Sequence, residues 1–147
     1  MQWNIYLSGE IHSDWREKIM QGSEELNLPV AFTSPVTNHD ASDAAGDVFR
    51  KPENSFWRDH QSAKVNAIRI KTMVEKCDLA IIRFGNKYKQ WNAAFDAGYC
   101  AALGKPYITL HDEELIHALK EVDGPALGWA TTPEQVVEVL QYVTSKE

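Results

Sequence analysis

Asp96 is the residue of this sequence whose type and surroundings most strongly suggest chemistry. It lies in the segment KYKQWNAAFDAGYCAALGKP, whose small and aromatic residues predict a helix from Gln90 to Leu103. Asn92, Asp96 and Tyr99 share one face of that helix, and Gly98 and the alanines would let it lie close against a sheet. An ionised carboxylate near a helix N-terminus can act as a nucleophile. A solvent-exposed aspartate that favours a helix N-terminus is the alternative, and spacing alone does not decide between the two.

Further polar side chains gather in three loops, each directly after a predicted strand. Carboxyl ends of parallel strands meet at one edge of a sheet, where ligands bind, so we expect these side chains to lie together. Ordinary loop polarity is the alternative explanation. Ser13 is predicted as the N-cap of the helix at 16–26, and Ser13 and Asp14 are better explained by helix capping than by ligand binding. The candidate substrate-binding residues are Gly9, Glu10, His12, Asn38, His39, Asp40, Gln90, Trp91 and Asn92.

Other motifs indicate neither a metal nor a cofactor. His111 and His117 flank the stretch DEELI at a separation that fits no common zinc spacing. The sequence contains no GxGxxG, P-loop or nucleophile-elbow pattern. Trp57 and Trp91 can stack on a base or simply pack, and lysines near residue 88 can meet a phosphate or belong to a solvated loop. We therefore expect no metal and no cofactor.

The elements that must position these residues alternate between strand and helix. This alternation predicts an α/β fold: a doubly wound, flavodoxin- or Rossmann-like parallel sheet of five strands with helices on both faces. A long polar segment at 36–55 has no clear structure, which often marks a functional region. The predicted strands are 3–8, 28–34, 79–84, 107–110 and 127–131, and the predicted helices are 16–26, 57–76, 90–103, 113–122 and a last one starting at Pro133.

The helix predicted at 57–76 carries an apolar stripe at three- and four-residue spacing, formed by Ala63, Ala67, Ile70 and Val74. This spacing is typical of an amphipathic helix that buries one face.

Composition narrows the classes of function. The 147 residues suffice for one domain, 1–147, and 15 Lys and Arg against 21 Asp and Glu give a net charge of −6. Binding of a nucleic acid polymer needs a basic surface, so we do not expect it. The N-terminus lacks signal-peptide features and no apolar run approaches a membrane span, which indicates a cytoplasmic protein without a membrane partner. Cys77 and Cys100 are expected to be buried free thiols.

Four stretches of the sequence, YLSGE, TNHD, FGNKYKQWN and FDAGYCAALGKP, resemble the YtoQ family over nearly the whole chain. That family is grouped with nucleoside 2-deoxyribosyltransferases. The resemblance implies a single nucleoside 2-deoxyribosyltransferase-like domain over 1–147. Because fold relatives are commonly dimers or larger, it also implies a homo-oligomer.

The resemblance also implies roles for particular residues. In the transferases, a glutamate two residues before a glycine attacks the anomeric carbon of the sugar, and Asp96 stands at that position before Gly98. Tyr6 would orient Asp96 by a hydrogen bond. Gln90 and Asn92 replace an aspartate and a glycine of the transferase pattern, and the family's sugar-binding aspartate is missing near Ile70.

The implied activity is cleavage or exchange of the N-glycosidic bond of a nucleoside or nucleotide through a carboxylate nucleophile. Three alternatives stay open on the sequence alone: an N-glycoside hydrolase, a module that binds a nucleotide-like ligand without chemistry, and a scaffold whose polar edge is ordinary surface. For a transferase, a hydrolase or a binding module, the expected partner is a small-molecule nucleoside or nucleotide-like substrate.

Overall fold

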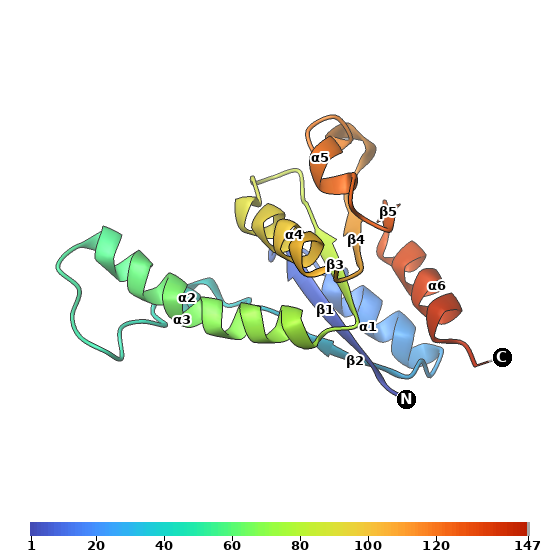
Figure 1. The fold of residues 1–147 in the computed structure, drawn as a ribbon, viewed down its shortest axis with the longest axis horizontal. Helices are drawn as coiled ribbons and strands as arrows, with labels where there is room; N and C mark the ends of the chain where they lie inside the picture. Colours follow the sequence, from blue (N-terminus) through green and yellow to red (C-terminus); the bar gives the residue numbers. More distant parts are fainter. Residues whose placement is uncertain (147) are drawn as a thin grey trace.

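The centre of the protein is a parallel β-sheet (Figure 1). The structure is a computed structural model that describes residues 1–146. The strand order is β2-β1-β3-β4-β5, and every neighbouring pair is parallel. The prediction of a doubly wound α/β fold with five parallel strands is confirmed. The strands are β1 (Trp3–Gly9), β2 (Val30–Thr33), β3 (Leu79–Arg83), β4 (Tyr107–Leu110) and β5 (Gly128–Ala130).

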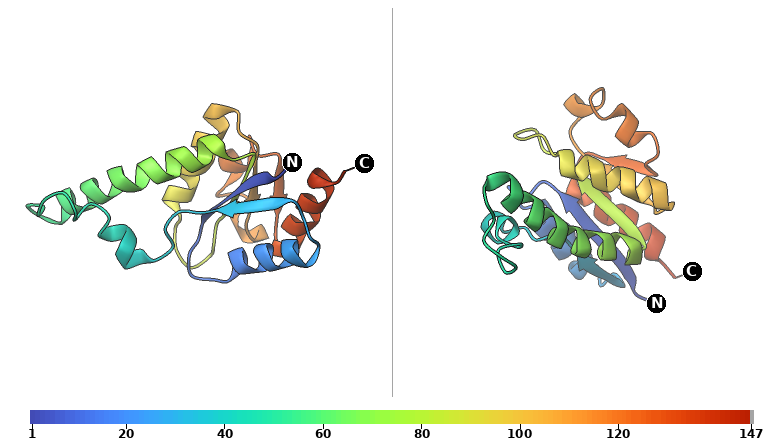
Figure 2. Two further views of the ribbon diagram at one scale, coloured as in Figure 1. Left: turned by 90° about the horizontal axis from the view of Figure 1, so that it is seen from below. Right: turned by 60° about the vertical axis from the view of Figure 1, so that its left-hand side comes forward.

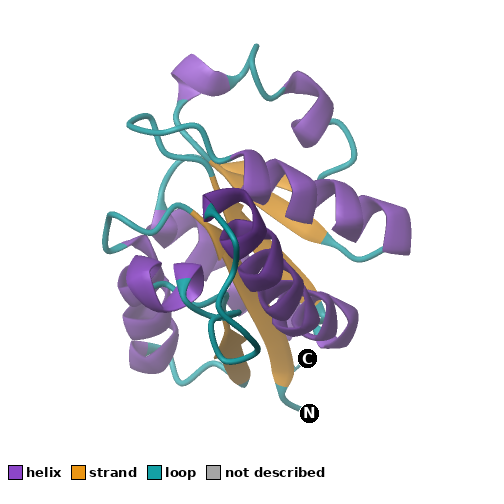
Figure 3. Cartoon of the chain, turned by 90° about the vertical axis from the view of Figure 1, so that its left-hand side faces the viewer, coloured by secondary structure: helices purple, strands orange, loops and turns teal. Residues whose placement is uncertain are grey.

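Helices cover both faces of the sheet (Figure 3). One apolar cluster joins the sheet to α1 (Trp15–Glu25) and α6 (Pro133–Thr144), which contribute residues such as Ile19 and Leu140. The opposite cluster joins it to α3 (Ser55–Lys76), α4 (Trp91–Leu103) and α5 (Lys120–Asp123). Strands β1 and β3 are neighbours, yet the chain leaves β1 toward one face and β3 toward the other. This reversal opens a crevice at the carboxyl edge, the usual ligand position in such sheets.

Three local predictions were wrong. The segment predicted as a loop contains a short helix, α2 (His39–Asp43), begun by Asn38, whose side-chain oxygen accepts from the Ala41 N–H at 2.9 Å. The helix predicted at 113–122 is a one-turn 3₁₀ helix, η1 (Glu113–Leu115), followed by the separate α5. Helix α1 has Asp14 at its cap position instead of Ser13. Helices this short have little stability of their own, so tertiary packing decides them.

Helix α3 is long but weakly buried. Of its 22 residues it buries Ser62 and Val74, and its N-terminal part extends beyond the sheet together with the preceding segment (Figures 1 and 2). We call residues 44–60 the arm. The predicted apolar stripe is therefore only partly in the core, since Val74 is buried while Ala63 and Ala67 are exposed.

Helix α4 packs closely on the sheet through alanines, as predicted, but not through Gly98. Ala93, Ala97 and Cys100 are buried against it. Gly98 is exposed, and a Cβ added there would meet nothing within 4 Å, so its predicted role in close packing was wrong.

Cys77 and Cys100 are buried free thiols, as predicted. Across residues 1–146, none of the helices has the length and apolar character needed to span a membrane.

Candidate active site

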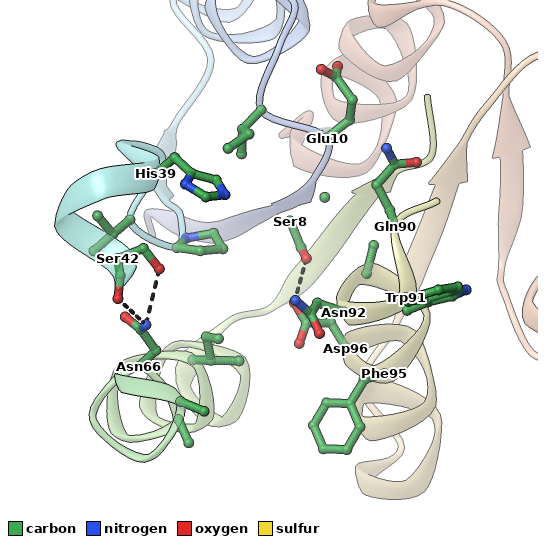
Figure 4. A pocket seen from close by; sticks show the side chains of 18 of the residues that line it. Ser8, Glu10, His39, Ser42, Asn66, Gln90, Trp91, Asn92, Phe95 and Asp96 are labelled. Atoms are coloured by element: carbon green, nitrogen blue, oxygen red, sulfur yellow. Dashed lines mark hydrogen bonds between the residues drawn. The ribbon is translucent and has the colours of Figure 1, made fainter. Parts of the chain in front are cut away.

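A cavity of about 1090 Å³ lies at the carboxyl edge of the sheet, enclosed by the end of β1, α2, α3 and the start of α4 (Figure 4). Most of the predicted site residues come together there. Asn38 and Asp40 lie outside the lining, Asn38 being occupied as the cap of α2. The predicted residues in the lining are Gly9, Glu10, His12, His39, Gln90, Trp91, Asn92 and Asp96.

Asp96 forms part of the cavity wall and is 4% exposed. Its Oδ2 accepts hydrogen bonds from the Ser8 hydroxyl at 2.5 Å and from the Tyr6 hydroxyl at 3.4 Å. The other oxygen, Oδ1, accepts no hydrogen bond from residues 1–146. Tyr6 is fully buried behind the wall, and the expected hydrogen bond from its hydroxyl to Asp96 is present. The arrangement leaves one carboxylate oxygen available to a ligand.

The electrostatics of Asp96 are set mainly by burial. Desolvation raises the pKa of the Asp96 carboxyl, while the hydroxyls of Ser8 and Tyr6 act in the opposite direction. Asp96 is the sixth residue of α4, and the helix dipole acts chiefly within the first turn, so the dipole is a weaker influence than the sequence suggested. Burial and the neighbouring Asp96 charge raise the pKa of Tyr6, which therefore stays a hydrogen-bond donor.

Ser8 is the site residue that the sequence analysis missed. It is 1% exposed and lies two residues after Tyr6 on β1, so both side chains point to the face covered by α4. The two-residue spacing of hydroxyl groups along a buried strand was the available signal. A buried hydroxyl needs a hydrogen-bond partner, and Ser8 finds one in Asp96, because α4 covers this face of β1.

Glu10 and Gly9 shape the loop after β1. Both carboxylate oxygens of Glu10 are engaged within the loop, one by the His12 N–H and the other by the Ser13 hydroxyl at 2.5 Å. The carboxylate points away from Asp96 (Figure 4). Gly9 has φ +112°, and a Cβ there would lie 2.1 Å from the carbonyl oxygen of Arg83 on β3. Only glycine fits this position, because the chain turns directly against the end of β3.

The loop before α4 is held in place by Gln90. Its Oε1 accepts from the Gly85 N–H at 3.0 Å, which closes the loop over residues 85–90. His12 and Tyr88 meet across the two loops with ring centres 4.8 Å apart. Trp91 is 75% exposed and points away from Ser8 and Asp96 (Figure 4), so its ring does not flank the carboxylate.

The opposite wall comes from α2 and α3. Ala63, Ala67 and Ile70 line the cavity, which explains why the first half of the apolar stripe of α3 is exposed while Ile70 and Val74 pack in the core. Asn66 donates through its amide nitrogen to the backbone and side-chain oxygens of Ser42, both at 3.1 Å, and so ties α3 to α2 (Figure 4). His39 points into the space between these helices and β1 (Figure 4). The cavity thus has a polar, carboxylate-bearing side and an apolar side.

The remaining candidate residues lie elsewhere. His111 is fully buried, with Nε2 2.9 Å from Asp123 Oδ2 and its ring stacked on Trp129. Trp57 packs edge-on against Phe56 on the arm, outside the cavity lining. Within residues 1–146, no three His, Cys, Asp or Glu side chains gather closely enough to hold a metal ion.

Comparison with known proteins identifies relatives over the whole chain. A family model described as nucleoside 2-deoxyribosyltransferase YtoQ matches residues 6–144. The chain is 40% identical over 148 residues to the uncharacterized protein YtoQ of Bacillus subtilis (strain 168), with both proteins covered completely.

Solved structures share the fold at much lower identity. A conserved protein from Enterococcus faecalis V583 is 16% identical with a TM-score of 0.65, covering 97% of this chain and 99% of its own. The 2-deoxyribosyltransferase of Bacillus psychrosaccharolyticus is 15% identical with a TM-score of 0.56, covering 93% and 95%. Since the family model spans nearly all of the sequence, the chain belongs to the nucleoside 2-deoxyribosyltransferase YtoQ family.

Proposed function

We propose that the protein cleaves or exchanges the N-glycosidic bond of a nucleoside or nucleotide, with Asp96 as the nucleophile. The observation that carries the proposal is the state of this carboxylate: it is buried, it lines the cavity, and Oδ2 is bound by two hydroxyls while Oδ1 stays open. A structural carboxylate in this position would be expected to engage both oxygens. Family membership supports the same activity.

In the first step, Asp96 Oδ1 forms a bond to the anomeric carbon while the carbon–nitrogen bond breaks, and its electron pair leaves with the base. The departing base takes up a proton, for which His12 and His39 are the candidate donors. Glu10, whose two carboxylate oxygens are held within its own loop, is assigned to shaping that loop. In the second step, a nitrogen of another base or a water molecule attacks the same carbon and releases the Asp96 carboxylate, while its proton passes to the group that protonated the first base. Two inversions at one carbon retain its configuration.

The other site residues are assigned to binding. Gln90 and Asn92 are proposed to contact the sugar hydroxyls beside Asp96, and Gly9 to let the ligand approach the backbone after β1. Trp91 is assigned to the outer rim, and Asn38 and Asp40 to the ordering of α2, whose His39 faces the cavity. We propose that residues 1–147 act as one nucleoside 2-deoxyribosyltransferase-like domain in the cytoplasm, on small molecules rather than on nucleic acid polymers.

Base release decides whether the proposed chemistry occurs. A panel of nucleosides and nucleotides is incubated with the wild type, Asp96→Asn and Asp14→Asn, and the free base is quantified by chromatography. We expect release by the wild type and by Asp14→Asn, whose exposed carboxylate lies outside the cavity. Asp96→Asn should lose activity by several orders of magnitude, because its amide cannot form the glycosyl-enzyme.

Addition of a second base separates the two possible outcomes of the reaction. Appearance of a new nucleoside identifies a transferase, and formation of free sugar alone identifies a hydrolase. If the wild type binds panel members but releases no base from any of them, the protein is a binding module and the catalytic proposal is wrong.

We also propose that the protein is a homo-oligomer. The arm carries apolar side chains that the chain itself leaves in solvent, among them Val48, Phe49, Phe56 and Trp57, which are 46–81% exposed. Exposed apolar patches of this kind mark interaction sites. A second copy covering the arm would bury them.

A further inference from the structure

Three oxygen-bearing side chains meet beneath the cavity. Tyr6 and Ser8 lie on the same face of β1, and Asp96 reaches them from α4. Both hydroxyls donate to one carboxylate oxygen, Oδ2. The sharing is asymmetric, because the Ser8 contact is 2.5 Å while the Tyr6 contact is 3.4 Å.

Building on the function proposed above, we propose that Ser8 is a positioning residue that fixes Oδ2 of Asp96 and thereby makes Oδ1 the attacking atom. The two oxygens of a free carboxylate are chemically equivalent and exchange by rotation about the Cβ–Cγ bond. A short hydrogen bond from the strand to one of them stops that rotation. The remaining oxygen then faces the cavity in a defined direction.

The two hydroxyl–Oδ2 distances favour Ser8 over Tyr6 for this role. An O–H···O⁻ contact of 2.5–2.7 Å is typical of a strong, charge-assisted hydrogen bond. At 3.4 Å the Tyr6 contact is near the outer limit for a hydrogen bond. Ser8 also counteracts the effect of burial on the Asp96 pKa more than Tyr6 does. An aspartate side chain has one methylene less than glutamate, so a fixed anchor on the strand matters for where its reacting oxygen lies.

Other titratable groups near Asp96 must be considered when its titration is interpreted. Tyr6 and Cys100 are its titratable neighbours in the core, and burial raises the pKa of Cys100 to about 12. Around the cavity, titratable side chains come from the loop after β1 (Glu10, His12), α2 (His39, Asp43), α3 (Asp59, Arg69, Lys71), the loop before α4 (Tyr88, Lys89) and α4 (Tyr99). Across the cavity, α3 presents the uncharged Ala63, Ala67 and Ile70.

The test compares Ser8→Ala with Ser23→Ala, Tyr6→Phe and Ser8→Thr. Ser23 is the matched control: it is equally buried, it lies on α1 away from the cavity, and its hydroxyl has no partner within residues 1–146. The carboxyl pKa of Asp96 is measured by ¹³C NMR on aspartate-labelled protein, without any substrate. Thermal unfolding checks that each variant folds.

We expect Ser8→Ala to raise the Asp96 pKa, to lower kcat by roughly 10- to 100-fold with little change in KM, and to move the acid limb of the pH–rate profile to higher pH. Tyr6→Phe should show the same changes to a smaller extent. Ser8→Thr, which keeps a hydroxyl on a strand that tolerates β-branching, should recover most of the activity. Ser23→Ala should behave as the wild type.

An unchanged Asp96 titration in Ser8→Ala would overturn the proposal, whatever the activity. So would a changed titration with unaltered kcat and pH profile. If the wild type releases no base from any panel member while the titration still shifts, the proposed function is wrong and Ser8 has a structural role only. The NMR measurement thus separates failure of the positioning role from failure of the function.

Discussion

At the scale of single residues, the site consists of one buried carboxylate and the hydroxyl groups that surround it. The sequence suggested Asp96, and the resemblance to the transferases implied Tyr6, but neither pointed to Ser8, because a serine next to a glycine at the end of a strand also fits an ordinary turn. It also counted Glu10 among the ligand-binding residues, whereas both oxygens of Glu10 are engaged within its own loop. Polarity is visible in a sequence, but the partner that already satisfies a polar group is not.

Because Asp96 is buried, its replacement by asparagine is expected to stabilise the fold although it abolishes the proposed activity. Because its folded-state pKa is raised, the folded protein binds the proton more tightly than the unfolded chain, so stability is highest below the ordinary pKa and falls as the pH rises through the raised one. Asp96→Asn removes the cost of burying an ionised carboxylate, and the amide oxygen can still accept the hydrogen bond from Ser8. At neutral pH we expect its melting temperature to exceed that of the wild type by about 2–4 °C, or roughly 1 kcal/mol for a domain of this size.

Differential scanning calorimetry from pH 3.5 to 8 measures this effect, with Asp14→Asn as the control that should follow the wild type. The advantage of Asp96→Asn should shrink toward acid pH, where the wild-type carboxyl is protonated. A lower melting temperature of Asp96→Asn at neutral pH would show that ionised Asp96 stabilises the fold.

The dependence of activity on pH follows from the same shift. The nucleophile must be ionised, and a raised pKa means that the ionised fraction falls at a higher pH than for an ordinary aspartate. The acid limb of kcat should therefore lie above the usual range of aspartate. A rate that stays constant down to pH 4 would contradict Asp96 as the nucleophile.

At the scale of elements, the alternation of strands and helices could be predicted because it depends on the spacing of apolar residues, which is visible in a short stretch of sequence. The stripe on α3 shows the limit of this prediction: Ala63 and Ala67 have helical spacing, but they face a cavity and are exposed, whereas Ile70 also packs against the core. Periodicity reports that a face is apolar without reporting what covers it. The breakdown of the 113–122 helix into η1 and α5 has a similar origin, since four-residue helices depend on contacts made elsewhere in the fold.

Two glycines give opposite predictions at this scale. Gly9→Ala forces a Cβ against the Arg83 carbonyl at a positive φ and should lower the free energy of unfolding by at least 1–3 kcal/mol. Gly98→Ala adds a methyl group to an exposed helical position with nothing within 4 Å, and should raise it by about 0.5–1 kcal/mol. Urea unfolding of both variants against the wild type tests the pair. Equal effects of the two substitutions would be inconsistent with the turn at the end of β1.

At the scale of the whole molecule, the arm is the feature that a single chain leaves unexplained. Its aromatic side chains were visible in the sequence, but their exposure depends on α3 extending beyond the sheet (Figure 2). A helix gains most of its stability in a protein by packing an apolar face. The exposed side chains of the arm are the observation on which the proposed homo-oligomer rests.

Replacement of Phe49 and Phe56 by serine should dissociate the proposed oligomer. Both side chains are at least 60% exposed, so the substitutions cost the folded monomer little. Sedimentation equilibrium should give a multiple of the chain mass for the wild type and the chain mass for the double variant. Tyr142→Ser on α6, also strongly exposed, is the control expected to keep the wild-type mass. A monomeric wild type at micromolar concentration would refute the oligomer.

The division of the cavity between two parts of the chain has a consequence for how such a protein can be altered. The proposed nucleophile and its hydroxyl partners come from α4 and β1, whereas the facing wall comes from the segment 35–71 that links β2 to β3. Exchange of that segment between family members would transplant ligand preference and leave the reacting group in place. The fold is in this sense modular: under the proposed function, one part holds the nucleophile and the other contacts the rest of the ligand.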